Sequence, residues 1–212
     1  MKSGFFITVE GGEGAGKSSA IQTMIEVAAQ RGFEIISTRE PGGIPIAEQI
    51  RGIVLDRANT AMDARTEALL YAAARRQHLA EKVIPALEAG KVVICDRFID
   101  SSLAYQGHAR GLGINEVFSI NRFAVGDWMP QLTIFMDVLP EVGLARIEAD
   151  LSREVNRLDL ESLVFHRKVR EGYLLVAERF PDRIVRIDAG QELEAVLQKI
   201  TEVLNQKLPG RV

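Results

Sequence analysis

The chain of 212 residues is 47% hydrophobic and 26% charged, a balance that excludes an intrinsically disordered protein. Its 26 Lys and Arg residues against 29 Asp and Glu residues give a net charge of −3, which disfavours a protein that binds nucleic acid over its whole surface. The single cysteine, Cys95, excludes a disulfide framework, and we find no secretory signal pattern and no apolar run of about 18 residues that would span a membrane. We therefore expect a cytoplasmic protein that binds neither nucleic acid nor a membrane.

Short apolar runs alternate with longer helical patterns along the chain. Strands are predicted for Phe5–Val9, Glu34–Thr38, Val92–Cys95, Leu132–Met136 and Ile184–Ile187. Helices are predicted near Lys17–Arg31, Ala64–Ala89, Asn115–Val125, Leu160–Phe180 and Leu193–Leu208. Because several runs are apolar throughout, they favour a parallel sheet that is buried on both faces. The strand-then-helix order predicts a doubly wound α/β fold, and we expect residues 1–212 to form a single domain, since no linker or repeat divides them.

The first predicted strand runs into a complete G-x-x-x-x-G-K-S motif, and a helical pattern follows it. Glycines in such a loop let backbone N–H groups turn toward phosphate oxygens, and the helix adds its positive dipole end. We expect Lys17 to reach the β- and γ-phosphates and the Ser18 hydroxyl to bind Mg²⁺. The residues predicted to bind ATP are Gly11, Gly12, Glu13, Gly14, Ala15, Gly16, Lys17, Ser18 and Ser19.

The motif does not by itself identify what receives the phosphoryl group. A switch GTPase would need an N-K-x-D motif for the base, which the chain lacks. An ATPase coupled to a partner would favour adjacent acidic residues at the end of an apolar strand, but Leu132–Met136 ends in Asp137 alone. A kinase with a small acceptor is the favoured hypothesis, and the ATPase stays open.

Polar residues follow the second and third predicted strands. The third strand leads into Asp96-Arg97, and the second leads into the turn Arg39-Glu40-Pro41-Gly42-Gly43. Asp96 is predicted to hold Mg²⁺ or its waters, and Arg97 to grip an acceptor phosphate in a bidentate contact. A structural ion pair between Asp96 and Arg97 is the alternative.

These motifs together resemble the thymidylate kinase family, in its bacterial branch. The resemblance is carried by Glu10 to Ser18, the turn Thr38 to Gly43, Asp96-Arg97-Phe98, Ala104-Tyr105-Gln106-Gly107 and the segment Leu70 to His78. It implies a three-layer P-loop nucleoside monophosphate kinase fold with five parallel strands and helices on both faces. It also implies a homodimer that uses ATP and Mg²⁺ to phosphorylate dTMP to dTDP, toward dTTP. Another nucleoside or nucleotide kinase is the nearest alternative.

The resemblance assigns roles around the thymine and the sugar. Tyr71 takes the place of an aromatic ring, usually Phe, that stacks on thymine, and Arg75 lies four residues on, on the same helical face. Arg75 corresponds to the arginine that recognises the thymine carbonyl, and Ser102 to a polar residue near the base. Tyr105 corresponds to the residue that crowds the 2′ position of the sugar, with Gln106 beside it.

The same resemblance places Arg39 and Arg97 around the acceptor phosphate. Glu10 corresponds to an acid that approaches the acceptor sugar or the metal. A carboxylate that only ends the first strand is the structural alternative for Glu10.

A lid is predicted at about residues 147–160, and the extra positive charge for phosphoryl transfer is expected there, since Glu13 makes the P-loop acidic. Arg157 is the predicted catalytic finger and Arg153 the second candidate. Both act with Lys17 and Arg97 in the predicted catalytic set. The alternative is that the lid arginines form a solvated helix face.

Overall fold

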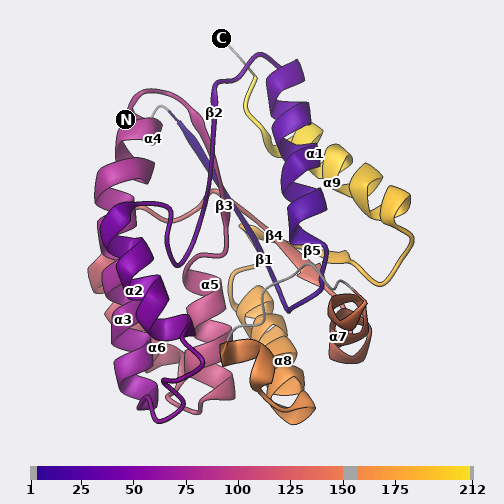
Figure 1. Cartoon of the computed structure of the whole chain (residues 1–212). Coiled ribbons are helices and arrows are strands. Elements are labelled where there is room, and N and C mark those ends of the chain that lie inside the picture. Colours follow the sequence, from indigo (N-terminus) through magenta and orange to yellow (C-terminus); the bar gives the residue numbers. More distant parts are fainter. Residues whose placement is uncertain (1–3, 150–156, 211–212) are drawn as a thin grey trace.

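Five parallel strands in the order β2-β3-β1-β4-β5 form the centre of the computed structural model, which describes residues 4–149 and 157–210 (Figure 1). Their bounds are β1 Phe5–Gly11, β2 Ile35–Arg39, β3 Val92–Asp96, β4 Leu132–Asp137 and β5 Ile184–Asp188. All five predicted strands are present, and each continues one or two residues past its predicted end. The polar residues that follow the apolar runs therefore complete the strands and lie together along one edge of the sheet.

Helices cover both faces of this sheet, so the predicted α/β fold is confirmed. The helices are α1 Lys17–Gln30, α2 Pro45–Leu55, α3 Ala64–His78, α4 Ile84–Glu88, α5 Ile99–Ser102, α6 Ile114–Val125, α7 Pro140–Glu148, α8 Leu163–Arg179 and α9 Leu193–Lys207, with short helical turns η1 Leu79–Val83, η2 Leu103–Ala109 and η3 Arg157–Leu160. Helices α1 and α9 pack side by side on one face, while α4, α5, α6 and α8 cover the other (Figure 1). None of the described helices is long and apolar enough to cross a membrane.

The alternating direction of side chains along β1 explains the two cores. Phe6 packs into the core beneath α4 and α5, whereas Ile7 and Val9 pack into the core beneath α1 and α9. All three side chains are fully buried. Successive residues of a strand point to opposite faces, so an apolar run is what a strand covered on both sides requires.

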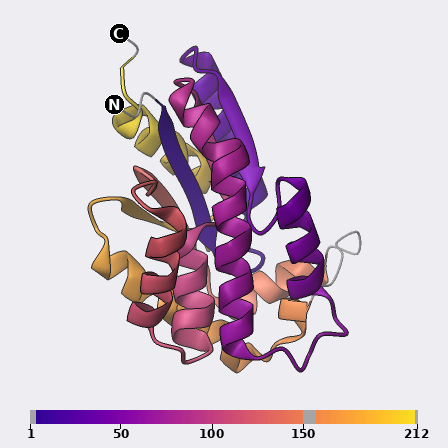
Figure 2. The same ribbon diagram turned by 90° about the vertical axis from the view of Figure 1, so that its left-hand side faces the viewer.

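The helix predicted over Ala64–Ala89 is interrupted. It consists of α3, the π-helical turn η1 and α4, which follow one another along one long rod (Figure 2). Within η1 the N–H of Ile84 bonds to the carbonyl of Leu79, five residues back. Pro85 follows directly; it has no N–H, and its ring would clash with the carbonyl four residues earlier, so the wider turn removes the conflict.

The helices α2, α5 with η2, and α7 were not predicted from the sequence, and neither was the turn η3. Pro45 and Pro140 are the first residues of α2 and α7, where the fixed φ of proline suits a helix start. Ile44 and Ala47 anchor α2 by packing against Ala74 of α3. The apolar Ile44-Pro45-Ile46 segment is thus the entry to a helix that packs on another helix.

Two helical glycines make opposite predictions for stability. A Cβ on Gly172 of α8 would lie 2.9 Å from the Cα of Ala104 in η2, whereas a Cβ on Gly52 of α2 would meet nothing within 4 Å. We expect Gly172→Ala to lower the free energy of unfolding by about 1–3 kcal/mol through overpacking. Gly52→Ala should raise it by about 0.5–1 kcal/mol because alanine favours the helix. Urea unfolding measures both, and equal stability of the two variants would contradict the close approach of α8 to η2.

Candidate functional site: a P-loop pocket

The loop between β1 and α1 has the form that a phosphate-binding motif requires. Gly14 and Gly16 have φ values of 66° and 82°, in the left-handed region that glycine tolerates. A Cβ on Gly14 would lie 2.0 Å from the carbonyl oxygen of Gly143 in α7. Lys17 is the first residue of α1, and its ammonium donates to the carbonyl oxygens of Gly11 at 3.3 Å and Gly12 at 2.9 Å. The lysine and the N-terminus of α1 therefore present positive charge at one place.

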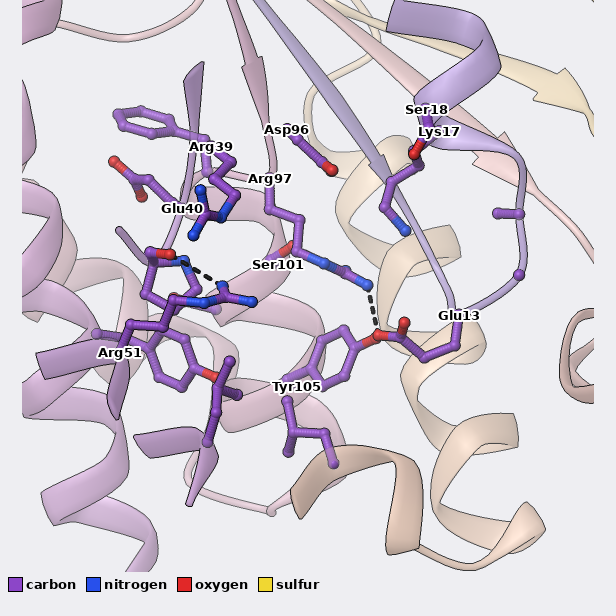
Figure 3. A pocket seen from close by; sticks show the side chains of 18 of the residues that line it. Glu13, Lys17, Ser18, Arg39, Glu40, Arg51, Asp96, Arg97, Ser101 and Tyr105 are labelled. Atoms are coloured by element: carbon purple, nitrogen blue, oxygen red, sulfur yellow. Dashed lines mark hydrogen bonds and ion pairs between the residues drawn. The ribbon is translucent and has the colours of Figure 1, made fainter. Parts of the chain in front are cut away.

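A pocket of about 470 Å³ opens beside this loop, at the carboxyl edge of the sheet (Figure 3). Its wall comes from the P-loop, the turn after β2, α2, α3, the β3–α5 junction, η2 and α7. Residues 13–18 of the predicted ATP set line the pocket, whereas Gly11, Gly12 and Ser19 do not. The pocket is large enough to hold more than the phosphates of one nucleotide.

Arg97 connects the P-loop to the opposite wall of the pocket. Its Nη1 donates to the carbonyl oxygen of Gly11 at 2.9 Å and to the Tyr173 hydroxyl at 3.0 Å, and its guanidinium lies 5.3 Å from the ring centroid of Tyr105. The backbone of Arg97 has φ 65°, a left-handed conformation that costs a non-glycine residue energy. Such strain at a pocket wall is typical of a functional residue held in place by its surroundings.

The side chain of Glu13 faces the acceptor half of the pocket, although its backbone belongs to the P-loop. Its carboxylate forms an ion pair of 2.5 Å with Nη2 of Arg97 and accepts a hydrogen bond of 3.2 Å from the Tyr105 hydroxyl (Figure 3). Arg97 is thus paired with Glu13 and not with Asp96, so the structural ion pair between neighbours is not what the structure contains.

Asp96 and Ser18 are the predicted metal ligands, and both line the pocket. Oδ1 of Asp96 is buried and has no hydrogen-bond partner among the described residues. A buried carboxylate oxygen without a donor suits a hard cation, and Mg²⁺ usually takes only one or two protein ligands beside phosphate oxygens and water. No group of three acidic, His or Cys residues that would hold a metal by themselves occurs within residues 4–149 and 157–210. These residues therefore fit Mg²⁺ that arrives with a nucleotide.

Tyr71 and Arg75 lie on one face of α3, as their spacing predicts, and both line the pocket. Tyr71 is 9% exposed, and burial raises the pKa of its hydroxyl to about 12. Arg75 is 2% exposed and donates to Glu40, Asn121 and the carbonyl of Phe98, and also to the Ser102 hydroxyl at 3.0 Å. Tyr71 offers a fixed ring at the pocket wall, and Arg75 a fixed guanidinium.

Gln106 and Arg157 meet at a buried carboxylate, Glu67 of α3, which sequence reasoning missed. Gln106 donates to Oε1 of Glu67 at 2.8 Å, and Nη2 of Arg157 pairs with Oε2. Burial alone would raise the pKa of Glu67, but the hydrogen bonds from Gln106 and Arg157 and the charge of Arg110 hold it below its usual range. Glu67 therefore links η2 to η3.

Arg157, the predicted catalytic finger, is buried in η3 and also donates from Nε to the carbonyl of Val54 at 2.9 Å. Its neighbour Leu158 lines the pocket, but Arg157 does not. Arg153 and the centre of the predicted lid lie outside the described residues. The catalytic roles of both arginines stay predictions.

Three further arginines line the pocket. Arg39 pairs with Glu48 at 3.0 Å, while Arg51 of α2 donates to the carbonyl of Pro41 at 3.0 Å, and Arg146 of α7 donates to the carbonyl of Ala189 at 3.0 Å. Arg51 was missed because α2 was not predicted. Its signal was the proline start followed by apolar residues three and four apart, which defines the helix face.

Unbalanced positive charge marks the pocket. Burial, followed by the charge of Arg97, lowers the pKa of Lys17, and burial, followed by the charge of Arg39, lowers the pKa of Arg51. Burial is the larger cause of both shifts, and the neighbouring guanidinium adds to it in each case. A bound polyanion would relieve this repulsion, so the arrangement suits nucleotide phosphates on both sides.

Glu10 lies behind the pocket wall and does not line it. It is fully buried and accepts hydrogen bonds from the Phe98 N–H at 2.7 Å, the Ser101 hydroxyl at 2.5 Å and the Tyr173 hydroxyl at 3.2 Å. Burial and the nearby charge of Asp100 raise its pKa to about 7. The structure thus brings Glu10 to the start of α5 and not to the pocket surface.

A P-loop that faces a second set of arginines across one pocket, on a five-stranded parallel sheet, defines a phosphotransferase of the P-loop kinase class. The family model for thymidylate kinase matches residues 9–200. The chain belongs to the thymidylate kinase family, so the resemblance carried by the motifs is confirmed.

Individual relatives agree along nearly the whole chain. A thymidylate kinase of Bacillus cytotoxicus is 60% identical over 205 residues, which cover 97% of this chain and 99% of that protein. One of Bacillus velezensis is 62% identical over 206 residues and 97% of each chain. One of Clostridium novyi is 59% identical over 200 residues, covering 94% of this chain and 98% of that protein.

The raised pKa of Glu10 predicts a pH-dependent stability. Between its ordinary value of 4.5 and its value of about 7, the folded chain keeps a proton that the unfolded chain has lost, so the free energy of unfolding falls as pH rises through this window. Glu10→Gln cannot ionise, and we expect it to be more stable relative to the unmodified protein at about pH 8 than at about pH 5. Urea unfolding at both pH values measures this difference, and an unchanged difference would show that Glu10 is not held protonated.

Proposed function

We propose that the chain phosphorylates dTMP in this pocket: the γ-phosphoryl of ATP passes to dTMP and gives dTDP and ADP, one phosphorylation before dTTP. The supporting observation is that a single pocket has two cationic walls, with Lys17 on one and Arg39, Arg51 and Arg97 on the other. A phosphorylated acceptor needs cations of its own beside those that hold the donor. The names of the relatives support dTMP as the acceptor.

The acceptor base lies between α3 and η2 in this proposal. Tyr71 stacks on the thymine, and Arg75 donates to its carbonyl oxygen, with Ser102 and Gln106 beside the base. Tyr105 excludes a 2′-hydroxyl, because its ring is 3% exposed and is held by Glu13 and Arg97. A fixed ring discriminates by shape better than a mobile one, since displacing it costs the contacts that hold it.

ATP lies along the P-loop with its phosphates on Lys17 and the N-terminus of α1. Ser18 and Asp96 hold Mg²⁺, which neutralises charge on the β- and γ-phosphates when it is bound. The guanidinium of Arg97, which donates to the Gly11 carbonyl, binds the acceptor phosphate. Its positive charge reduces the repulsion between the donor and acceptor phosphates as they approach. The chain itself supplies position and positive charge, which is what phosphoryl transfer requires.

In this proposal the lid segment at about residues 147–160 supplies the catalytic arginine. Arg157 is the first candidate for it and Arg153 the second. The pairing of Arg157 with Glu67 must open for its guanidinium to reach the γ-phosphoryl. Gln106, which lies beside the acceptor base in this proposal, donates to the same Glu67 carboxylate. A change in Gln106 when the acceptor binds would therefore act on the carboxylate that holds Arg157.

We further propose a homodimer in the cytoplasm, where ATP is available. Helices α3 and α6 pack against each other, and they expose Leu69 by 55% and Phe123 by 93%. Large apolar side chains exposed on neighbouring helices favour a protein contact. A sedimentation mass of one chain would contradict the dimer, and recovery of the protein in a membrane fraction would contradict the location.

One assay tests the reaction. We expect ADP release from ATP to depend on dTMP, to be far slower with the other nucleoside monophosphates or with deoxynucleosides, and to stop when Mg²⁺ is removed by a chelator. ADP release is measured by coupled spectrophotometry with each acceptor in turn. Release that needs no acceptor would refute a kinase and favour an ATPase, and a preference for an unphosphorylated deoxynucleoside would refute dTMP as the substrate.

Arg157→Ala tests the catalytic arginine. We expect kcat to fall by about 10³-fold or more, while KM for ATP stays near that of the unmodified protein, because the guanidinium acts on the transition state. Arg153→Ala is the matched control from the same lid. If Arg153→Ala alone loses kcat, the role belongs to Arg153, and if neither variant loses it, the lid does not supply the arginine.

A further inference from the structure

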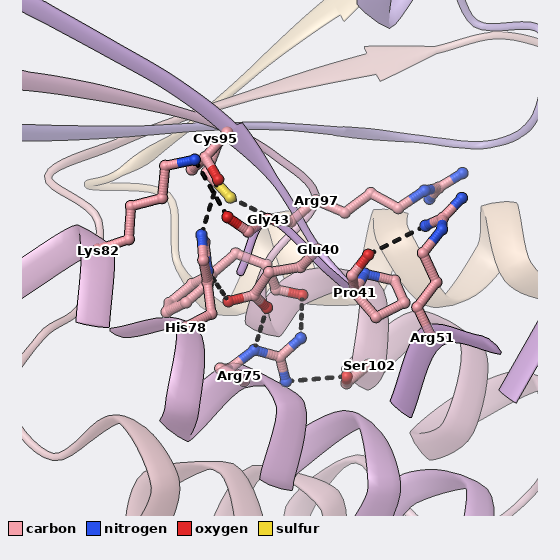
Figure 4. A network of polar contacts seen from close by, with 12 residues as sticks. Glu40, Pro41, Gly43, Arg51, Arg75, His78, Lys82, Cys95, Arg97 and Ser102 are labelled. Carbon is pink, nitrogen blue, oxygen red and sulfur yellow. Dashed lines mark hydrogen bonds and ion pairs between the residues drawn. The ribbon is translucent and has the colours of Figure 1, made fainter. Parts of the chain in front are cut away.

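A chain of buried polar groups joins β2 to α3 behind the pocket wall (Figure 4). Thr38 Oγ1 lies 2.8 Å from Nε2 of His78, Nδ1 of His78 lies 2.9 Å from Oε1 of Glu40, and Oε2 of Glu40 lies 2.8 Å from Nε of Arg75. His78 is fully buried and does not line the pocket, whereas Glu40 and Arg75 do. This row of polar groups therefore runs from His78, which lies behind the pocket wall, to Arg75, which lines the pocket.

Within residues 4–149 and 157–210, the hydrogen bonds of Arg75 leave one of its N–H groups without a partner. A guanidinium has five N–H groups, and four of those of Arg75 have described partners: Glu40 at Nε, Ser102 and Asn121 at Nη1, and the carbonyl of Phe98 at Nη2. The fifth N–H is on Nη2. Its direction depends on the orientation of the whole planar group, which the ion pair with Glu40 helps to set.

His78 in turn prevents Glu40 from rotating. Each carboxylate oxygen has its own donor, Arg75 on Oε2 and His78 on Oε1, so neither can shift without breaking a buried bond. Because a carboxylate only accepts, Nδ1 of His78 carries the hydrogen toward Glu40. The site has no spare room: a Cβ on Gly43 would lie 2.6 Å from Thr38 Oγ1 and 3.1 Å from His78 Nε2.

The same turn also supports the phosphate side of the acceptor site. Glu40 is followed by Pro41, whose carbonyl oxygen accepts from Nη1 of Arg51 at 3.0 Å, and the Glu40 N–H bonds to the carbonyl of Asp96 at 2.9 Å. A shift of Glu40 would therefore move the partner of Arg51 together with the partner of Arg75.

We propose that His78 is a positioning residue for the acceptor: through Glu40 it fixes the one remaining N–H of Arg75 toward the 4-position of the pyrimidine base. The inference rests on the proposed function and deepens it. It predicts that His78 sets the affinity for the acceptor and the preference for a 4-carbonyl over a 4-amino group, without contact to any ligand and without effect on ATP.

His78→Gln and His78→Asn are a matched pair. The amide nitrogen of Asn falls near the position of Nδ1 and keeps the donor to Glu40, whereas that of Gln falls near Nε2 and keeps only the contact to Thr38. We expect His78→Gln to raise KM for dTMP by roughly tenfold, the loss of one buried charge-assisted hydrogen bond. His78→Asn should stay within about threefold of the unmodified protein, and KM for ATP should be unchanged in both.

Base selectivity separates positioning from a purely structural role. dUMP and dCMP both lack the methyl group of thymine; uracil has a 4-carbonyl and an N3–H, whereas cytosine has a 4-amino group and an N3 that only accepts. In this proposal His78 acts only on the donor of Arg75 at the 4-position, so the change between variants in the ratio of their inhibition constants against dTMP reports that donor. We expect this ratio to fall in His78→Gln and to be kept in His78→Asn. Equal effects of the two variants on KM for dTMP, a parallel rise of KM for ATP, or an unchanged ratio would each overturn the proposal.

Thr38→Val is the second route if a His78 variant does not fold. It removes the hydroxyl partner of Nε2 and keeps the β-branched shape, and we expect a smaller rise in KM for dTMP, about threefold, with KM for ATP unchanged. An unaltered KM for dTMP in Thr38→Val would contradict the proposal that Thr38 and His78 hold Glu40 and Arg75 in place. The unmodified protein is assayed in parallel: if it releases no ADP with dTMP, the proposed function fails, whereas variants that match an active unmodified protein refute only the role of His78.

Discussion

The pocket is organised around the contacts of one side chain, the guanidinium of Arg97. It follows β3, donates back to the carbonyl of Gly11 at the end of β1, pairs with Glu13 of the P-loop and stands over the ring of Tyr105. Its left-handed backbone turns the chain from strand to helix at that point. In the proposed function this side chain therefore connects the wall for the donor to the wall for the acceptor, and direct transfer between two nucleotides needs a fixed separation of these walls.

The fold gathers several arginines around Arg97 and holds each of them with fixed partners. Arg75, Arg97 and Arg157 each bond to a carboxylate, namely Glu40, Glu13 and Glu67. All three also donate to main-chain carbonyl oxygens. Buried guanidiniums need such partners, because an uncompensated charge in the interior is costly. For Arg75 and Arg97, which line the pocket, these partners also fix the orientation of the guanidinium before a ligand arrives, so less free energy is lost in ordering the site on binding.

Much of this site was accessible from the sequence, for a definite reason. The P-loop and Asp96-Arg97 are local patterns whose geometry follows from the strand or helix on which they lie. Tyr71 and Arg75 were found through the family resemblance, and their four-residue spacing places them on one face of a helix. The residues that were missed, or that lie elsewhere than expected, owe their places to contacts between distant parts of the chain. Arg51 depends on a helix that begins at Pro45, the carboxylate of Glu13 turns away from the loop that contains it, and Glu10 is covered by α5 and α8. None of these directions follows from spacing along the chain.

The sequence alone determined that strands alternate with helices, that the sheet is parallel and covered on both faces, and that a phosphate-binding loop follows the first strand. These properties depend on residues close together in the chain, where periodicity and backbone freedom decide the outcome. Only the tertiary structure decided which acid holds which arginine, because the partners Glu40 and Arg75, and Glu67 and Arg157, are 35 and 90 residues apart. Partners so distant meet only after the helices have packed on the sheet, and burial then selects those pairs.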